Sequence, residues 1–286
     1  MDTHFKQATI IGVGLIGGSL GGVMRSKGLA DTVIGVGRSR ENLDTAVMMG
    51  LIDRYTHDMK KGVAGSDLVV ICSPVGSFES VAKEIKPYLK DQAIITDVGS
   101  VKGALVGRLE DIFYLKARFV AAHPIAGSER SGSAAADKDL FKGARCIVTP
   151  TRNTDLDALE DVVALWEAAG ARVERMDPDD HDRIFALVSH LPHVAAYAMV
   201  SALMDMDGGE KAITYAGGGF KDFTRIAGSH PEMWRDVCLL NKSNILAALD
   251  SYQEALWKLR ELIDKGDGEK LAAEFARAQG VRKKIG

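Results

Sequence analysis

Cysteine is scarce in this sequence, and its scarcity argues against proteins that depend on disulfides or on a zinc site. The chain of 286 residues has three cysteines, which are far apart and each in an apolar setting: Cys72, Cys146 and Cys238. An odd number of cysteines without paired spacing argues against a disulfide framework and against a zinc site. We therefore expect reduced, buried thiols, no metal ion and a cytoplasmic location.

Long apolar runs, a targeting segment and an excess of one charge are also missing. No run of about 18 apolar residues appears, so we expect no membrane span. The first residues, MDTHFKQ, lack the basic and apolar regions of a secretory signal. The 36 Lys and Arg residues nearly balance the 39 Asp and Glu residues, which gives a net charge of −3. We expect neither nucleic acid nor an anionic membrane as a partner, because nothing in this balance attracts them.

Strand-like and helix-like segments alternate regularly through the first 177 residues. Short apolar or β-branched runs recur, most with a helical pattern between them: ATIIGVG (8–14), TVIGVG (32–37), SDLVVICSP (66–74), AIITDVGS (93–100), RFVAAHP (118–124), ARCIVTP (144–150) and ARVERMD (171–177). Such alternation predicts one buried, mostly parallel sheet with right-handed crossovers. From Pro178 onward only helical periodicity continues, after DPDDHD (177–182), which is typical of a capped helix start. We predict an α/β fold, with a Rossmann-type, doubly wound domain over residues 1–177 and an all-helical domain over residues 178–286.

A glycine-rich turn follows the first predicted strand. Gly12, Gly14 and Gly17 form a GxGxxG pattern that opens the first helix. The first glycine permits a tight turn, the second lets the backbone approach a pyrophosphate, and the third lets the helix pack on the strand. Leu15 and Ile16 begin a helix whose unpaired N–H groups face the phosphates. We predict a dinucleotide site; the alternative is a glycine-rich turn without a ligand.

The end of the second predicted strand bears on the choice of dinucleotide. An acidic residue usually stands there and binds the ribose 2′-hydroxyl of NAD. This chain has Gly37 at that place, followed by Arg38 and Ser39, which suit a 2′-phosphate. The pattern favours NADP over NAD; the alternative is a basic surface turn that touches nothing. Ser73 and Pro74, at another strand end, are expected to line the ribose side of the nucleotide.

An ionisable residue ends a buried strand in FVAAHPIAGSERSG (119–132). Pro124 pushes His123 into an extended conformation at the end of the predicted strand. Ligands of doubly wound sheets bind beyond the carboxyl ends of the strands, so His123 is a candidate proton acceptor; the alternative is a structural histidine. Ser100 ends a neighbouring strand and is expected to cap a helix that begins at Val101. Its hydroxyl could at the same time face the imidazole.

Several segments together resemble the prephenate/arogenate (cyclohexadienyl) dehydrogenase family of tyrosine biosynthesis. They occur in the family's order over nearly the whole chain: GVGLIGGSLG, TDVGSVK, HPIAGSERSG, SHLPH and GGGFKDFTRIAGSHPEMW. The resemblance implies oxidative decarboxylation of prephenate, arogenate or both, giving 4-hydroxyphenylpyruvate or tyrosine, with hydride transfer to NAD(P)+. It further implies that His123 accepts the proton of the ring hydroxyl and that Ser100 orients His123.

The resemblance also extends to the helical half. It implies that Arg225 binds the ring carboxylate and that His193, Ser128 and Gly219 lie near the substrate; without it, an interhelix ion pair would be the simpler explanation of Arg225. His190 could be a packed or capping histidine. Apolar residues at spacings of four and three form a stripe for helix packing: Ile245, Leu249, Tyr252, Leu256, Leu259 and Ile263. The stripe could face the chain's own core, but the resemblance implies a homodimer formed through the helical domain.

Two other functions are compatible with the first domain alone. One is a two-domain dehydrogenase or reductase that acts on a small β-hydroxy acid or an imine. The other is a dinucleotide sensor without catalysis. Both lack an explanation for the HPIAG and GGGFKDFTRIA segments, which favour the dehydrogenase of the resembled family. No residue of the sequence decides between prephenate and arogenate.

Overall fold

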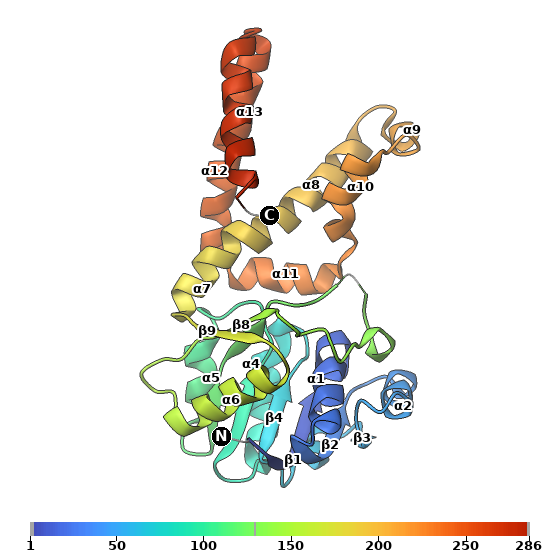
Figure 1. Ribbon diagram of the computed structural model, residues 1–286, viewed down its shortest axis with the longest axis vertical. Coiled ribbons are helices and arrows are strands. Elements are labelled where there is room, and N and C mark those ends of the chain that lie inside the picture. Colours follow the sequence, from blue (N-terminus) through green and yellow to red (C-terminus); the bar gives the residue numbers. More distant parts are fainter. Residues whose placement is uncertain (1–2, 129, 285–286) are drawn as a thin grey trace. The chain divides into compact units, whose positions relative to one another are not determined.

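A six-stranded parallel sheet forms the centre of the first part of the chain, as the computed structural model shows (Figure 1). The structure describes residues 3–128 and 130–284. The strand order is β3-β2-β1-β4-β5-β6, the order of a doubly wound nucleotide-binding sheet, which confirms the predicted α/β class. The strands are β1 (Phe5–Ile11), β2 (Ala30–Val36), β3 (Arg54–Thr56), β4 (Leu68–Ile71), β5 (Ala93–Asp97) and β6 (Ala117–Val120).

Helices bury both faces of this sheet because successive strand side chains point to opposite faces. In β1, Ala8 and Ile10 belong to one buried cluster and Ile11 belongs to the other. The first cluster takes side chains from α1 (Leu15–Ser26), α2 (Arg40–Met48) and α6 (Leu156–Ala168). The second takes them from α3 (Met59–Val63), α4 (Phe78–Ile85) and α5 (Val106–Phe113). This two-sided core fixes the strand ends where the site lies.

A second, three-stranded sheet corrects the prediction of one continuous sheet. It has the order β7-β8-β9, from β7 (Ala122–Pro124), β8 (Arg145–Val148) and β9 (Arg172–Arg175). The predicted strand over 118–124 is therefore split, with β6 in the large sheet and β7 paired antiparallel to β8. At the split, the side chain of Asp97 at the end of β5 accepts the backbone N–H of Ala122 at 3.2 Å. The chain leaves the large sheet at this point and carries His123 beyond its edge.

The helical segment after β9 begins as predicted. The Asp177 side chain accepts the backbone N–H groups of Asp179 and Asp180 and caps α7 (Pro178–Phe185). A π-helical turn (Ala186–His190) joins α7 to α8 (Leu191–Asp205). Pro192 lies in the first turn of α8, where proline is tolerated, directly after the π-helical turn.

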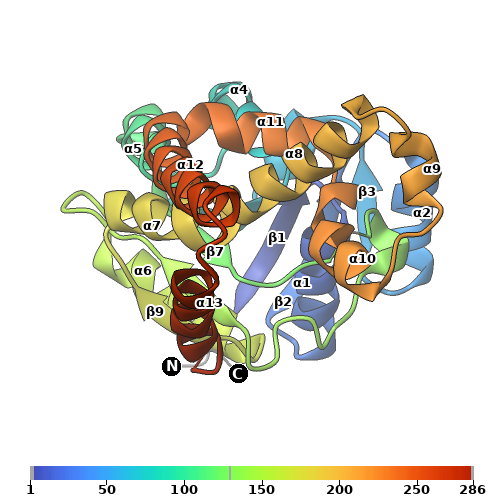
Figure 2. The same cartoon turned by 90° about the horizontal axis from the view of Figure 1, so that it is seen from above.

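Further helices complete the helical segment (Figure 2). They are α9 (Gly209–Ile213), α10 (Gly218–Thr224), a 3-10 turn (Arg225–Gly228) and α11 (Pro231–Leu240). α8 packs against α10 and the 3-10 turn, and α11 packs against the short turn Val75–Ser77 that follows β4. The helical segment thus contacts the nucleotide-binding half at a strand end.

The chain forms two compact units, residues 1–242 and residues 243–286. The second unit consists of most of α12 (Lys242–Asp264) and of α13 (Gly268–Arg282). Asp267 caps α13, and an ion pair between Lys258 and Glu274 joins the two helices. The predicted apolar stripe is helical throughout, and its members Leu256 and Ile263 are exposed.

Two features of the structure bear on the expectations from composition. The helical run Pro178–Asp205 is long and apolar enough, by length and composition, to cross a membrane, with a mean hydropathy of 1.4 in its most apolar window. Polar residues such as Ser189, His190 and His193 interrupt its apolar sequence, and a core helix of a soluble protein can have the same length and composition. Of the three free thiols, Cys146 is buried as expected, whereas Cys72 and Cys238 are partly exposed.

Candidate active site

The glycine-rich turn after β1 has the shape of a phosphate cradle. Gly12 has φ +97°, and a Cβ there would lie 2.7 Å from the carbonyl carbon and oxygen of Cys72. A Cβ on Gly17 would lie 2.3 Å from the Gly12 carbonyl oxygen, whereas one on Gly14 would meet no described atom within 4 Å. Within the described chain no side chain caps α1, so its first N–H groups remain available. The residues present therefore fit a dinucleotide pyrophosphate.

The other predicted nucleotide residues lie at the ends of neighbouring strands. Arg38 and Ser39 follow β2 and are exposed, and the Ser39 hydroxyl accepts the N–H of Asn42 at 3.2 Å as the cap of α2. Ser73 and Pro74 follow β4, and the Ser73 hydroxyl lies 2.8 Å from that of Ser77. Because β1 lies between β2 and β4, all these residues gather at the carboxyl-end edge around the point where the strand order reverses.

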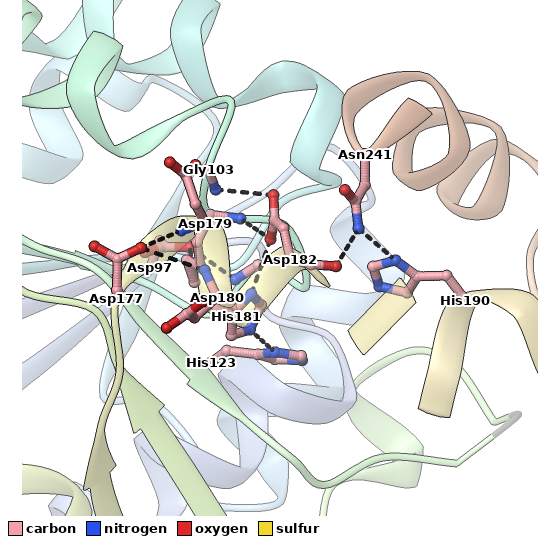
Figure 3. Close-up of polar contacts among 12 residues, drawn as sticks. Asp97, Gly103, His123, Asp177, Asp179, Asp180, His181, Asp182, His190 and Asn241 are labelled. Carbon is pink, nitrogen blue, oxygen red and sulfur yellow. Dashed lines mark hydrogen bonds and ion pairs between the residues drawn. The ribbon is translucent and has the colours of Figure 1, made fainter. Parts of the chain in front are cut away.

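His123 meets a second imidazole that sequence reasoning missed (Figure 3). Its Nδ1 lies 2.8 Å from Nε2 of His181 on α7, with the ring centroids 5.1 Å apart. Phe185, one turn further along α7, packs on both rings at centroid distances of 5.0 and 4.4 Å. His123 itself is only partly buried.

The carboxylate of Asp182 holds both His181 and the loop after β5. Its Oδ1 lies 2.8 Å from Nδ1 of His181 and accepts the N–H of Lys102 at 2.8 Å, while Oδ2 accepts the N–H of Gly103 at 2.8 Å. These bonds hold the loop between β5 and α5 on the helical segment. α5 begins at Val106, so the helix expected from Val101 and its cap by Ser100 are wrong.

A buried ion pair lies beneath these histidines. Lys102 and Asp97 form it with side chains that are 1% and 2% exposed. Asp97 also accepts the backbone N–H groups of Gly99 at 2.8 Å and Ala122 at 3.2 Å. A buried charge is retained only when it is paired and hydrogen-bonded, and this one is. The pair ties the loop after β5 to the start of β7 and places a fixed positive charge near His123.

Burial keeps the central histidines neutral. It lowers the pKa of His123 well below 6.5, and His181 and Lys102 lower this pKa further. Burial also lowers the pKa of His181, and the opposing hydrogen bond with Asp182 only partly offsets it. His190, whose pKa falls to about 4 mainly through burial, lies 3.0 Å from the Asn241 amide. His190 is thus packed, as one of its predicted roles required, and His123 is available as a base at neutral pH.

The predicted substrate residues of the helical segment are more exposed. His193 stacks on Trp234 with centroids 3.7 Å apart, and its Nδ1 lies 2.9 Å from the carbonyl oxygen of Ser189. Burial first, and the charge of Arg225 to a smaller extent, lower the pKa of His193, which places Arg225 within electrostatic range of it. Gly219 is exposed, a Cβ placed there would meet no described atom within 4 Å, and its contact with the substrate stays a prediction.

Within the described part of the chain, two further predicted residues make no hydrogen bond to His123. Ser128 is exposed, and its hydroxyl accepts the N–H of Arg130 at 3.2 Å. Across residues 3–128 and 130–284 no hydrogen bond joins Ser100 to His123, and the substrate and orienting roles of these serines stay predictions. His181 and Asp182 lie in DPDDHD, which predicted only a helix start. Lys102 lies in TDVGSVK, which contributed only to the family resemblance.

The chain is similar to known dehydrogenases over nearly its whole length. Residues 20–175 match the family model "Prephenate dehydrogenase, nucleotide-binding domain", and residues 177–277 match "Prephenate dehydrogenase, dimerization domain". A cyclohexadienyl dehydrogenase of Zymomonas mobilis is 36% identical, with 98% of this chain and 96% of the relative covered.

Solved structures agree with these matches. A prephenate dehydrogenase of A. aeolicus, in complex with hydroxyphenyl propionate and NAD+, is 40% identical with a TM-score of 0.91 and 98% of both chains covered. A Synechocystis arogenate dehydrogenase is 30% identical with a TM-score of 0.80, covering 98% of this chain and 100% of that one. A Coxiella burnetii pyrroline-5-carboxylate reductase, at 18% identity and a TM-score of 0.53 over 96% and 92% of the two chains, shares the fold alone.

Proposed function

The chain belongs to the prephenate dehydrogenase family, and on that premise we propose that it catalyses the oxidative decarboxylation of prephenate, arogenate or both. The observation that carries the proposal is the neutral imidazole of His123, held beyond the carboxyl end of β5 at the same sheet edge as the glycine-rich turn. The products are 4-hydroxyphenylpyruvate or tyrosine, carbon dioxide and reduced NAD(P).

His123 acts in this proposal as the proton acceptor. A hydride leaves a carbinol carbon more easily as its oxygen loses its proton, and a positioned base contributes about 10²–10⁴-fold. When bound, the dinucleotide supplies the nicotinamide carbon that accepts the hydride. Loss of the ring carboxylate as carbon dioxide then leaves its bonding electrons in the ring. The proton held by His123 returns to the resulting phenolate oxygen, so that the imidazole is neutral again.

Arg225 and His193 are proposed to bind the anionic substrate. A guanidinium binds a carboxylate through two parallel hydrogen bonds, which suits the ring carboxylate. The influence of Arg225 on the pKa of His193 supports a shared site. Ser128 and Gly219 are proposed as further substrate contacts. Ser100, in the loop between β5 and α5, is proposed to help orient His123.

The preferred dinucleotide is proposed to be NADP. Gly37 takes the place of the acidic residue typical of NAD sites, and the exposed Arg38 and Ser39 follow it. The hydroxyl of Ser39 accepts a hydrogen bond from α2, so its own proton is free to be donated to a 2′-phosphate. Gly12, Gly14, Leu15, Ile16 and Gly17 are proposed to hold the pyrophosphate, and Ser73 and Pro74 to line the ribose side.

The helical half is proposed to form a homodimer. The matched model for residues 177–277 is described as a dimerization domain. Large apolar side chains are exposed along this half, including Leu187, Val188, Met199 and Met204, and such exposure on a folded chain is typical of an interface. We propose domains over 1–177 and 178–286, a cytoplasmic location, and no nucleic-acid or membrane partner. Light scattering of the purified protein tests the dimer.

The catalytic proposal is tested by following reduced nicotinamide with purified protein. Prephenate and arogenate are each supplied with NADP+ and with NAD+. We expect turnover of at least one substrate and a higher kcat/KM with NADP+. Folded protein that binds a dinucleotide but turns over neither substrate would overturn the proposal, whereas turnover with NAD+ alone would overturn only the cofactor preference.

A further inference from the structure

We propose that Asp182 and His181 fix the tautomer of His123, so that His123 presents an unprotonated Nε2 to the substrate. The inference rests on the proposed function for the role of His123 as a base. It makes His181 and Asp182 positioning residues, because they act through His123. Hydrogen-bond contacts run from Asp182 through His181 to His123 (Figure 3).

Asp182 determines which nitrogen of His181 carries the proton. An ionised carboxylate offers only acceptors, and this one already accepts the backbone N–H groups of Lys102 and Gly103, each at 2.8 Å. Nδ1 of His181 lies 2.8 Å from Oδ1 of the same carboxylate. A contact of this length is a hydrogen bond only if one side donates, so Nδ1 of His181 carries a proton.

The proton on Nδ1 leaves the other nitrogen of a neutral His181 as an acceptor. That nitrogen, Nε2, lies 2.8 Å from Nδ1 of His123. His123 must therefore donate from Nδ1, and a neutral imidazole with a proton on Nδ1 has none on Nε2. The second ring nitrogen of a histidine commonly sets the state of the first in this way.

The opposite arrangement would require a charged His181. An imidazolium donates from both nitrogens and would force the His123 proton onto Nε2, which removes the base. Burial lowers the pKa of His181, and the positive charge of the buried Lys102 lowers it further. Phe185 covers both rings with an apolar surface, which also disfavours a charged ring.

The backbone of Asp182 is also held in place, by a hydrogen bond from the end of α11. The amide of Asn241, at the end of α11, donates to the backbone carbonyl of Asp182 at 2.8 Å. The same amide lies 3.0 Å from Nδ1 of the buried His190. Asp182 is therefore held by the loop after β5 through its carboxylate and by α11 through its backbone. An imidazole whose ring nitrogens have no fixed hydrogen-bond partner would populate both tautomers.

Nitrogen-15 NMR of histidine-labelled protein tests the tautomer directly. The seven histidines are few enough to resolve, and the His123→Asn variant assigns the His123 signals by their loss. We expect a protonated, pyrrole-type Nδ1 and an unprotonated, pyridine-type Nε2 for His123 in the wild type at neutral pH. A His123 signal with its proton on Nε2 would overturn the proposal.

Two substitutions of His181 separate the hydrogen bond from packing. His181→Phe keeps a ring but offers no acceptor, so we expect mixed tautomers at His123 and a fall in kcat of about 10- to 10³-fold, with dinucleotide affinity unchanged. His181→Gln places an amide oxygen near the position of Nε2, so we expect it to retain the Nδ1-protonated form and more of the activity than His181→Phe. A His181→Phe variant with wild-type tautomer and wild-type kcat would overturn the proposal.

The NMR experiment tests the tautomer of His123 independently of the proposed function. The NMR spectrum is recorded without substrate, so it decides the tautomer even if neither prephenate nor arogenate is turned over. If His181→Phe does not fold, the spectra of the wild type and of His181→Gln still decide the matter. Loss of the Nδ1-protonated form in His181→Gln, in a folded protein, would count against the proposal.

Discussion

Nδ1 of His123 lies 2.8 Å from Nε2 of His181, although 58 positions separate the two residues in the sequence. His123 is on β7 of the nucleotide-binding half, and His181 is on α7 of the helical segment. One imidazole pair therefore joins the chain's two predicted domains at the point where the chemistry is proposed. Changes on α7 should alter the reactivity of a residue on β7 without touching substrate.

Alanine substitutions at two positions of the glycine-rich turn should differ in their effects on stability. Gly14→Ala meets no described atom, so we expect unchanged thermal stability but at least about tenfold weaker dinucleotide binding, since the added methyl group occupies the phosphate's place. Gly12→Ala combines a φ of +97° with a Cβ 2.7 Å from the Cys72 carbonyl and should lower stability as well. Melting temperature and dinucleotide titration measure both, with the exposed Gly107→Ala as control. Unchanged affinity in Gly14→Ala would contradict the phosphate site.

The residues after β2 predict the cofactor response. Arg38→Ala should lower kcat/KM for NADP+ by about tenfold and leave that for NAD+ nearly unchanged, because only NADP carries the 2′-phosphate. Arg40→Ala is a matched control, since Arg40 already pairs with Asp44 at 3.6 Å. Equal losses of kcat/KM with both dinucleotides in Arg38→Ala would show that Arg38 does not bind the 2′-phosphate.

Arg225 predicts a loss in substrate affinity. Arg225→Ala should raise KM for the substrate by about tenfold or more, with dinucleotide affinity unchanged, because a cation for the ring carboxylate is removed. Lys221→Ala, which removes an exposed charge on the adjacent α10, should change KM little. Steady-state kinetics with saturating dinucleotide measure both variants, and an unchanged KM in Arg225→Ala would remove Arg225 from the site.

The buried histidines predict a loss of stability in mild acid. Burial lowers the pKa of His190 from 6.5 to about 4. Above pH 6.5 this histidine is neutral in both states; between 6.5 and 4 only the unfolded chain binds the proton, so the folded state loses stability as the pH falls. The loss is complete below 4 and amounts to about 3 kcal/mol for His190, and His123 and His181 act in the same direction.

Urea unfolding at pH 7, 6 and 5 measures this slope. Carboxylates with lowered pKa values, such as Asp67 and Glu79, titrate in the folded state below pH 5. They therefore contribute little to the change in the free energy of unfolding between pH 7 and pH 5. His190→Asn should reduce the slope. A free energy of unfolding that stays constant from pH 7 to pH 5 would contradict the neutral, buried state of these histidines.

Local patterns made most of the fold predictable. The alternation of apolar runs and helical segments, and the glycine spacing after β1, each lie within a few residues, and the structure confirms the parallel sheet and the helix starts at Leu15 and Pro178. The split of residues 117–124 between two sheets could not be predicted, because no local pattern marks the contact between Asp97 and Ala122 that accompanies it.

Long-range contacts explain what sequence reasoning missed in the site. Asp182 accepts the N–H groups of Lys102 and Gly103 across about 80 positions, and no local sequence pattern reveals this contact. His181 was hidden in a segment whose acidic residues already explained it as a helix start. His123, by contrast, stood out because an ionisable residue at the end of an apolar run is unusual by itself.

The proton-accepting role of His123 is tested most directly by His123→Asn. With the substrate and dinucleotide that support turnover in the wild type, we expect kcat to fall by at least about 10²-fold while the dinucleotide dissociation constant stays nearly unchanged. That result would show that His123 takes part in the chemical step and not in holding the nucleotide. Wild-type turnover by folded His123→Asn protein would contradict the account.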